Sequence, residues 1–315
     1  MRDLMLLYQR QKPAAKSPVL WVSVHAADVT GTPPFSIEAW LVPNPDVYDP
    51  QTGKGAIKLS SKVLEKHREK SQNTVLASEK GISEDKLNYD DIRLFIASYL
   101  EQVGYAHGID QEDLTVELFL PLSLMNQPIE RMGIPARLDD EPMGNGEDDC
   151  PHVMLRSGDR IEERPRKWSR WYKKWDQLVA NLQTVTTTML AKDRATLAKE
   201  LAMDNIVGFS LKTSPSLAAR GEVYKLIKSG APLAIWVRDN PHAVPLAQQI
   251  EADLLGYPLH ERAVRVMRLR RETEFLEEAD CTSSPELGHH LVLLWENPQH
   301  VPPGSNVPLY NSQLA

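Results

Sequence analysis

Short apolar segments that alternate with longer helical patterns are the feature that most limits how this chain can fold. The segments "PLAIWV", residues 232–237, and "HLVLLW", residues 290–295, are apolar on both sides of a pleat, as in strands covered on two faces. The helical patterns between such strands are long enough for the crossovers, of about a dozen residues or more, that parallel strands require. The chain is therefore predicted to have an α/β (or α+β) fold, with a mixed, largely parallel central sheet flanked by helices.

An N-terminal β-hairpin is predicted at an edge of this sheet. Its strands, Val19–His25 and Phe35–Val42, alternate in polarity and are rich in Val, Ile and Trp, and "TGTPP" between them supplies turn residues. A further strand is predicted over Thr115–Leu120. His289 and His290 are expected to start the last strand and to face opposite sides of it.

Two helical regions are predicted in the middle of the chain. Residues 87–103 place apolar side chains on one face of a helix that Gly104 or Gly108 closes, and residues 165–203 carry two helical patterns. Residues 60–72 are compatible with a short charged helix.

The chain is predicted to form one domain. Neither a strong linker nor an internal repeat divides its 315 residues, so a single composite domain is expected over 1–315. Polar, turn-rich composition predicts loop-like insertions at residues 44–84 and 138–150.

Charge and cysteine content limit the class of protein. A formal charge of −7 and a pI near 5.8 argue against broad binding to a phosphate backbone. The two cysteines, Cys150 and Cys281, and the lack of an early apolar run fit a cytoplasmic protein. The longest apolar runs fall far short of the roughly 20 residues that cross a bilayer, so no membrane partner is expected.

The segment "WSRWYKKW" predicts an amphipathic helix. Trp168, Trp171 and Trp175 stand at the i, i+3 and i+7 positions of one stripe. The favoured interpretation packs this stripe into the core, because tryptophan is highly buried on average, and leaves a basic flank in water. Alternatively the helix stacks nucleic-acid bases or presents a hot-spot surface to a protein partner. The flank is formed by Lys167, Arg170, Lys173 and Lys174.

Sequence motifs of catalysis are missing. The chain has no GxGxxG, GxxxxGK[ST], HExxH, GxSxG or CxxC pattern, so no catalytic residue, cofactor or metal site is predicted. The acidic loop Asp139–Asp149, followed by His152, is the exception to weigh: it could supply metal ligands, or it could be a solvated loop.

Charged residues at two predicted strand ends form a candidate ligand site. Arg156, Asp159 and Arg160 follow one strand, and Arg238 and Asp239 close another. If the carboxyl ends of these strands lie together, the three arginines could form a cationic pocket for a carboxylate or phosphate. In the alternative interpretation each arginine pairs with a neighbouring acid and fixes a loop.

Several segments, taken in order, resemble the C-terminal domain of vWA-MoxR-associated proteins (VMAP-C). The segments that carry this resemblance most distinctively are "LPLSLMNQP" and "HHLVLLWENPQHVPP". The segment "IEAWLV" in the early hairpin also looks like the start of that domain. The other segments that carry the resemblance are "VELFLPLSLMNQPIERM", "HVMLRSGDRI", "WSRWYKKWDQL", "VGFSL" and "SGAPLAIWVRD".

The resemblance implies a part in a bacterial multi-component conflict or defence system that combines a MoxR-type AAA+ ATPase, a von Willebrand A protein and an effector such as a peptidase. In that setting the domain is expected to be a non-catalytic adaptor or sensor that binds these proteins. The alternatives are a metal-dependent enzyme acting on nucleic acid or nucleotide, and a nucleic-acid-sensing module. The residues predicted to bind a partner or ligand are Arg156, Asp159, Arg160, Trp168, Trp171, Trp175, Arg238 and Asp239.

Overall fold

The computed structural model defines the fold around one continuous sheet. The residues that the structure describes are 17–27, 33–60, 87–129, 152–162, 168–180, 188–191, 200–201, 203–204, 206–211, 214–217, 221–238, 265–266, 269 and 287–305.

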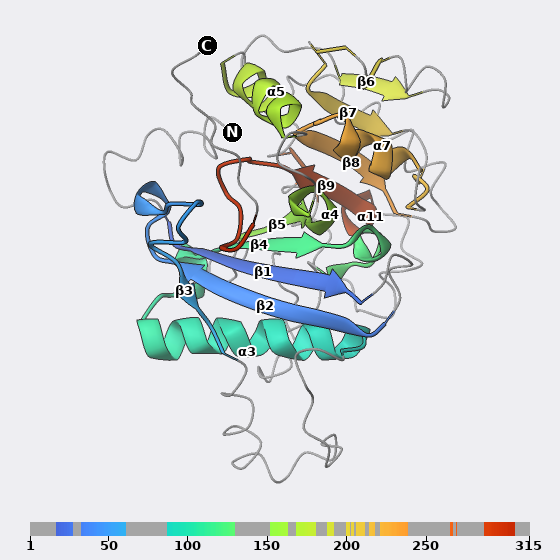
Figure 1. Ribbon diagram of the computed structural model, residues 1–315. Coiled ribbons are helices and arrows are strands. Elements are labelled where there is room, and N and C mark those ends of the chain that lie inside the picture. The colour runs from blue at the N-terminus through green and yellow to red at the C-terminus, as the bar shows by residue number, and fades with distance from the viewer. Residues whose placement is uncertain are drawn as a thin grey trace.

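A nine-stranded sheet forms the centre of the molecule, in the order β3-β2-β1-β4-β5-β9-β8-β7-β6 (Figure 1). The hairpin of β1 and β2 pairs along its whole length and, with β3, extends one edge, as predicted. The strand bounds are β1 Val19–Ala26, β2 Phe35–Val42, β3 Ile57–Lys58, β4 Thr115–Leu120, β5 His152–Ser157, β6 Thr188–Ala191, β7 Gly208–Leu211, β8 Leu233–Val237 and β9 Leu291–Trp295.

Strand direction divides the sheet into two blocks. The strands β1, β4, β5 and β9 run parallel to one another, and β8, β7 and β6 are also mutually parallel. The two blocks meet at β9 and β8, which are antiparallel. The sheet is therefore mixed and mostly parallel, as predicted, but the carboxyl ends of the two blocks lie at opposite edges.

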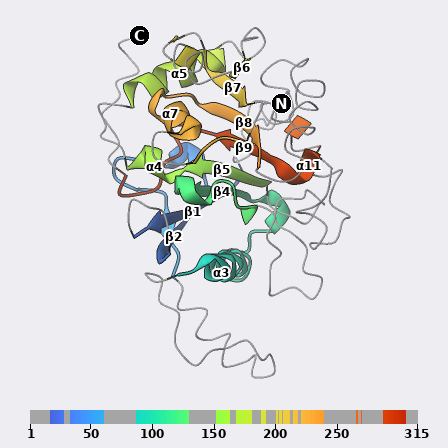
Figure 2. The ribbon, with the colours of Figure 1, turned by 90° about the vertical axis from the view of Figure 1, so that its right-hand side faces the viewer.

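The longest helix, α3 (Tyr89–His107), has clear signals at both ends. Asn88 and Asp91 form a reciprocal capping box at its start, and Gly108, with φ of 62°, ends it in the left-handed conformation. Figure 2, in which α3 is seen end-on, places it beside β1 and β2, far from α5 and α7. The remaining helical segments are η1 Pro45–Val47, η2 Gln111–Asp113, η3 Leu122–Leu124, α4 Gly158–Ile161, α5 Ser169–Ala180, α7 Glu222–Lys228 and α11 Leu287–His290.

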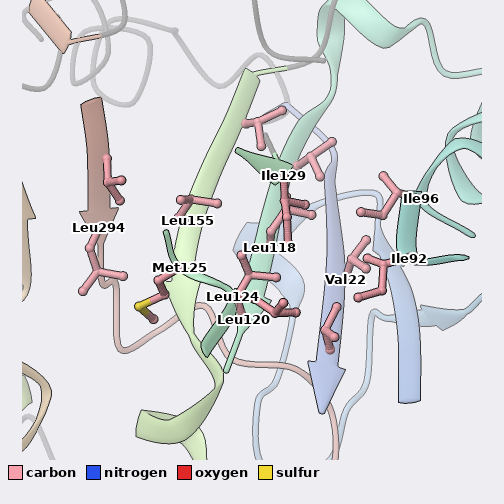
Figure 3. Close-up of a cluster of buried hydrophobic side chains, with 14 of the residues drawn as sticks. Val22, Ile92, Ile96, Leu118, Leu120, Leu124, Met125, Ile129, Leu155 and Leu294 are labelled. Atoms are coloured by element: carbon pink, nitrogen blue, oxygen red, sulfur yellow. The ribbon is translucent and has the colours of Figure 1, made fainter. Parts of the chain in front are cut away.

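Both faces of the sheet are buried along its central strands. On one face, aliphatic side chains of β1, β4, β5 and β9 pack with α3 and with the segment after β4, as Val22, Leu118, Leu155 and Leu294 illustrate (Figure 3). The other face carries an aromatic cluster formed by Trp21, Trp40, Phe119, Trp168, Trp171 and Tyr172, together with Val19, Val42, Ile161 and Val301. This second face is the one on which the charged residues of the sheet are also buried.

Two sequence-based predictions were wrong in detail. The stretch with two helical patterns contains a strand, β6, where the β-branched run before Met189 favours extended backbone. His289 and His290 lie in the four-residue helix α11 before β9, and they do not start the strand. Residues 61–72 of the predicted helix at 60–72 and the loop at 138–150 lie outside the described residues. The described part of the predicted loop at 44–84, residues 44–60, contains η1 and the short strand β3.

Replacement of Gly230 by alanine tests the close approach of two helices. Gly230 ends α7 with φ of 75°, and an added Cβ would lie 2.8 Å from the backbone nitrogen of Trp171 in α5. Gly108 has a similar φ and open space around it. We expect Gly108→Ala to lower the free energy of unfolding by about 1–2 kcal/mol, and Gly230→Ala to cost about 1–3 kcal/mol more because backbone must move. Urea denaturation measures both; equal losses would show that the approach is not tight.

Candidate functional site

The strand-end arginines of β5 are buried in the interior. Arg156 is the fifth residue of β5 and Arg160 lies in α4, and their exposed fractions are 0% and 1%. Burying a guanidinium is costly unless its charge is paired and its donors are bonded. Both side chains therefore require acids and carbonyls nearby, and the sheet and the segment after β9 supply them.

Arg156 pairs with a glutamate of the neighbouring strand. Its Nη1 lies 2.6 Å from Oε2 of Glu117 in β4, whose exposed fraction is 1%. The other oxygen of Glu117 lies 2.7 Å from Nδ1 of His300. Arg156 also stacks over Phe119, with 5.0 Å between the guanidinium carbon and the ring centroid. The result is a buried chain of charged and polar groups, Arg156–Glu117–His300.

Arg160 pairs with a second glutamate. Its Nε lies 3.3 Å from Oε2 of Glu296, and its Nη2 donates to the carbonyl of Ala231 at 2.8 Å. Oε1 of Glu296 accepts from the backbone N–H of Ser157 at 2.6 Å. The guanidinium lies 4.9 Å above the ring of Trp171. Glu296 thus joins the end of β9 to the end of β5 and, through Arg160, to the start of β8.

Residues 296–305, here called the strap, follow β9 and are held largely by side chains. Arg156 Nη2 donates to the carbonyls of Asn297 and His300, and Trp171 Nε1 donates to the carbonyl of Glu296 at 2.9 Å. Tyr172 and Tyr48 donate through their hydroxyls to the strap carbonyls of Pro298, at 3.2 Å, and Val301, at 2.8 Å. Figure 1 shows the strap, in dark red, beside the blue loop before β3.

Burial and pairing act in opposite directions on the acids. Burial alone would raise the pKa of Glu117, but Arg156 and His300 more than offset it and hold that pKa below its usual range. Burial raises the pKa of Asp159, although its carboxylate accepts the backbone N–H of Leu122 at 2.7 Å. Burial also lowers the pKa of Arg160 to about 10, against the attraction of Glu296, so Arg160 stays charged at neutral pH.

The tryptophans of the basic segment pack into the molecule. Trp168, Trp171 and Trp175 are 1%, 1% and 8% exposed, in agreement with the favoured interpretation of the stripe. Trp168 meets Trp171 edge-on at 5.4 Å, and Trp175 meets Trp295 at 5.7 Å. The α5 helix therefore covers the aromatic side of the sheet.

The basic flank of α5 differs from the prediction. Arg170 and Lys173 are exposed and pair with Asp204, at 3.4 and 2.7 Å. Lys174 is fully buried, and burial lowers its pKa to about 8. Lys167 lies outside the described residues. The exposed charge that a nucleic-acid-binding helix would present is thus reduced by one buried lysine and by the neighbouring acid.

Arg238 does not join Arg156 and Arg160. Its backbone N–H donates to the carbonyl of His290, at the start of β9, whereas Arg156 reaches Asn297 after the end of β9. The two positions are separated by roughly 20 Å of strand. The proposed pocket of three arginines is therefore wrong, because β8 runs antiparallel to β9. Asp239 lies outside the described residues.

The described residues contain no group of three or more His, Cys, Asp or Glu side chains that could hold a metal ion. The acidic loop Asp139–Asp149 lies outside this part of the chain, so the hypothesis of metal-dependent catalysis there stays untested. Within the same described ranges, no helix combines the length and the apolar character needed to cross a membrane.

A family comparison adds a second line of evidence. The family model for the vWA-MoxR associated protein C-terminal domain, VMAP-C, matches residues 59–298, about three quarters of the chain. The chain belongs to the VMAP-C family. No curated protein and no solved structure gave a match. The matched range begins after the β1–β2 hairpin and ends at Pro298, yet in this VMAP-C chain the hairpin forms part of the same sheet and the strap packs against it.

Sequence reasoning missed the acids that neutralise the arginines. Glu117 is the one charged residue in the strand "TVELFL", and a lone acid in an apolar strand is the signal that could have identified it. His300 and Glu296 gave no such signal, because both follow or end a short strand in a turn-rich segment. In this VMAP-C chain the motif "WENPQHVPP" forms most of the strap. Part of its role is to supply partners for the buried Arg156 and Glu117.

Removal of Glu117 is expected to be severely destabilising. Glu117→Gln leaves Arg156 buried without its counter-charge, so the free energy of unfolding should fall by about 3–5 kcal/mol. The double variant Glu117→Gln with Arg156→Met removes both charges and should recover part of that loss. Chemical denaturation of the two variants provides the comparison; a double variant less stable than Glu117→Gln alone would contradict the role of the pair.

The two carboxyl groups Glu117 and Asp159 should give opposite pH dependences. The folded-state pKa of Glu117 is lowered, so its stabilising effect is present above 4.5 and is lost as the pH falls below that value. The folded-state pKa of Asp159 is raised, so its protonation at falling pH adds stability. Asp159→Asn should therefore be neutral or stabilising at pH 7 and should steepen the loss of stability in acid. Thermal unfolding between pH 3 and 7 measures this, and a shallower acid loss in Asp159→Asn would refute it.

Proposed function

We propose that this VMAP-C chain is a non-catalytic adaptor in a bacterial defence system, coupling a vWA protein and a MoxR-type ATPase to an effector such as a peptidase. The observation that carries the proposal is the family match, because the family name itself associates the domain with vWA and MoxR proteins. An adaptor acts by binding, so its chemistry lies in surfaces and in the rigidity with which they are held.

The buried charges support a scaffolding role. Arg156 and Arg160 direct their donors to Glu117, to Glu296 and to backbone carbonyls. Both guanidinium groups face a buried carboxylate, although Nε of Arg156 and Nη1 of Arg160 have no hydrogen-bond partner among the described residues. Buried ion pairs contribute little net stability but penalise alternative arrangements, because breaking a pair leaves a charge without its counter-charge. Such a scaffold would hold the surface over β5, α5 and the strap in one geometry.

The predicted interface residues enter this proposal in a changed role. Trp168, Trp171 and Trp175 are buried, so they would position the outer face of α5 and would not themselves insert into a partner. The exposed groups of that face include Lys173 and Arg170, each paired with Asp204. A protein partner would then meet α5 through a polar rim.

Co-purification from the native host tests the adaptor proposal. The tagged chain is isolated with and without nuclease treatment, and co-eluting proteins are identified by mass spectrometry. We expect a vWA protein, a MoxR-type ATPase or an effector to be retained after nuclease. Recovery of nucleic acid alone would reject the adaptor in favour of nucleic-acid sensing.

Lys173→Glu is the matched control for that experiment. The substitution reverses the charge of a residue on α5 whose side chain is 57% exposed. If the chain binds nucleic acid through α5, this substitution should weaken that binding and make it less dependent on salt. A protein that binds elsewhere on the surface should still be retained. Loss of the captured proteins in Lys173→Glu would place their interface on α5.

A further inference from the structure

The strap lies in the molecule as a bound peptide lies in a groove. Its backbone makes few hydrogen bonds of its own, among them His300 N–H to the Asn297 carbonyl at 3.2 Å. Five of its carbonyls, those of residues 296, 297, 298, 300 and 301, accept from side chains of other elements. The side chains that hold it, here called the cradle, are Tyr48, Glu117, Arg156, Trp171 and Tyr172.

The cradle has the chemistry of a groove for proline-containing peptides, and the strap lies in it with two turns, closed by the N–H groups of His300 and Ser305. Such peptides have few N–H groups, so they are recognised by aromatic rings and by donors that reach their carbonyls. The strap contains Pro298, Pro302 and Pro303. The cradle directs two phenol hydroxyls and the Arg156 guanidinium to carbonyls after Glu296, and its indole N–H to the carbonyl of Glu296 itself. Burial raises the pKa of Tyr48, so its hydroxyl remains protonated and can donate.

One position of the strap adds selectivity. Nδ1 of His300 lies 2.7 Å from Oε1 of Glu117, and the imidazole is also close to Trp21, with 6.2 Å between the ring centroids. Glu117 is held on its other side by Arg156 and cannot turn away without breaking that pair. A peptide in the cradle would therefore need a donor such as histidine at this point, two residues after a proline.

We propose that the cradle is a peptide-binding groove which residues 297–305 occupy in cis, and that a proline-containing partner segment with a histidine displaces them. The inference rests on the adaptor function and assigns that adaptor a site and a class of partner. The segment after Glu296 is the part that moves, because Glu296 itself is fixed between Arg160 and the backbone of Ser157.

The strap lowers the apparent affinity of the chain for an added peptide, because it occupies the cradle. A peptide binds only the fraction of molecules in which the cradle is open, so a weaker strap raises the affinity for an added peptide. His300→Ala weakens the strap by removing its contact with Glu117, while Glu117 keeps its pairing with Arg156. No side chain of the cradle is replaced by this substitution.

The probe is a fluorescent peptide with the sequence NPQHVPPGS, that of residues 297–305. We expect the His300→Ala chain to bind it at least about tenfold more tightly than the wild-type chain in fluorescence polarisation. Adding Tyr48→Phe and Tyr172→Phe removes two donors of the cradle and should lose most of that gain. A peptide with alanine in place of its histidine is the matched control and should bind more weakly. Equal binding by all chains, or none, would overturn the proposal.

Hydrogen exchange of the wild-type chain gives a test that needs no variant to fold. If the strap opens by itself, the amides of residues 299–301 should exchange faster than those of β9, and added peptide should slow them. Exchange of strap and β9 at one common rate would show that the strap opens only with the sheet, and would reject the proposal. If the vWA or MoxR proteins still co-purify while the peptide fails to bind, the cradle is wrong and the adaptor function stands.

Discussion

The buried pair of Arg156 and Glu117 is the interaction on which the arrangement of this side of the sheet depends. The two residues come from adjacent parallel strands, in positions where apolar side chains would otherwise meet. Placing both charges there requires every remaining donor and acceptor to find a partner, since a buried unpaired group is costly. His300 and the carbonyls of the strap meet that requirement except at Nε of Arg156, which has no hydrogen-bond partner among the described residues. The position of the strap follows from the charges, and the position of α5 follows in turn from the bonds that Trp171 and Tyr172 make to the strap.

The antiparallel seam between β9 and β8 decides which residues can act together. In a wholly parallel sheet the carboxyl ends of β5 and β8 would lie at one edge, and Arg238 would approach Arg156. Here the start of β8 lies beside the end of β9, so Arg160 contacts the carbonyl of Ala231, which precedes β8. The seam thus brings a turn with Gly230 against α5, on the side of Arg160 where the predicted pocket would have placed Arg238.

Local patterns in the sequence predicted the hairpin, the strand Thr115–Leu120 and the helix that Gly108 ends, because each depends on spacing and capping within a few residues. Strand direction does not follow from such patterns, because a fully apolar strand has the same composition whether it runs parallel or antiparallel to its neighbour. The prediction of a three-arginine pocket was wrong for that reason. The partners of Arg156 lie 39 and 144 residues away along the chain, so no local motif contains them. What the sequence did indicate was the type of solution: arginines at strand ends that pair with acids and fix a loop.

A strap held by carbonyl contacts differs from one held by apolar burial alone. Apolar packing is non-directional and tolerates a shifted register, whereas five directed hydrogen bonds and one histidine–glutamate contact specify a single register. The same contacts exchange readily for those of a similar peptide, because backbone carbonyls are common to all sequences and only the prolines and the histidine select among them. Val301 is fully buried and opposes that exchange, so a displacing segment must supply an apolar side chain at the same place. The residues that make the fold unique at this edge of the sheet are then also those that would select a partner. In the adaptor proposed above, they would transmit the arrival of one protein to the surface that binds another.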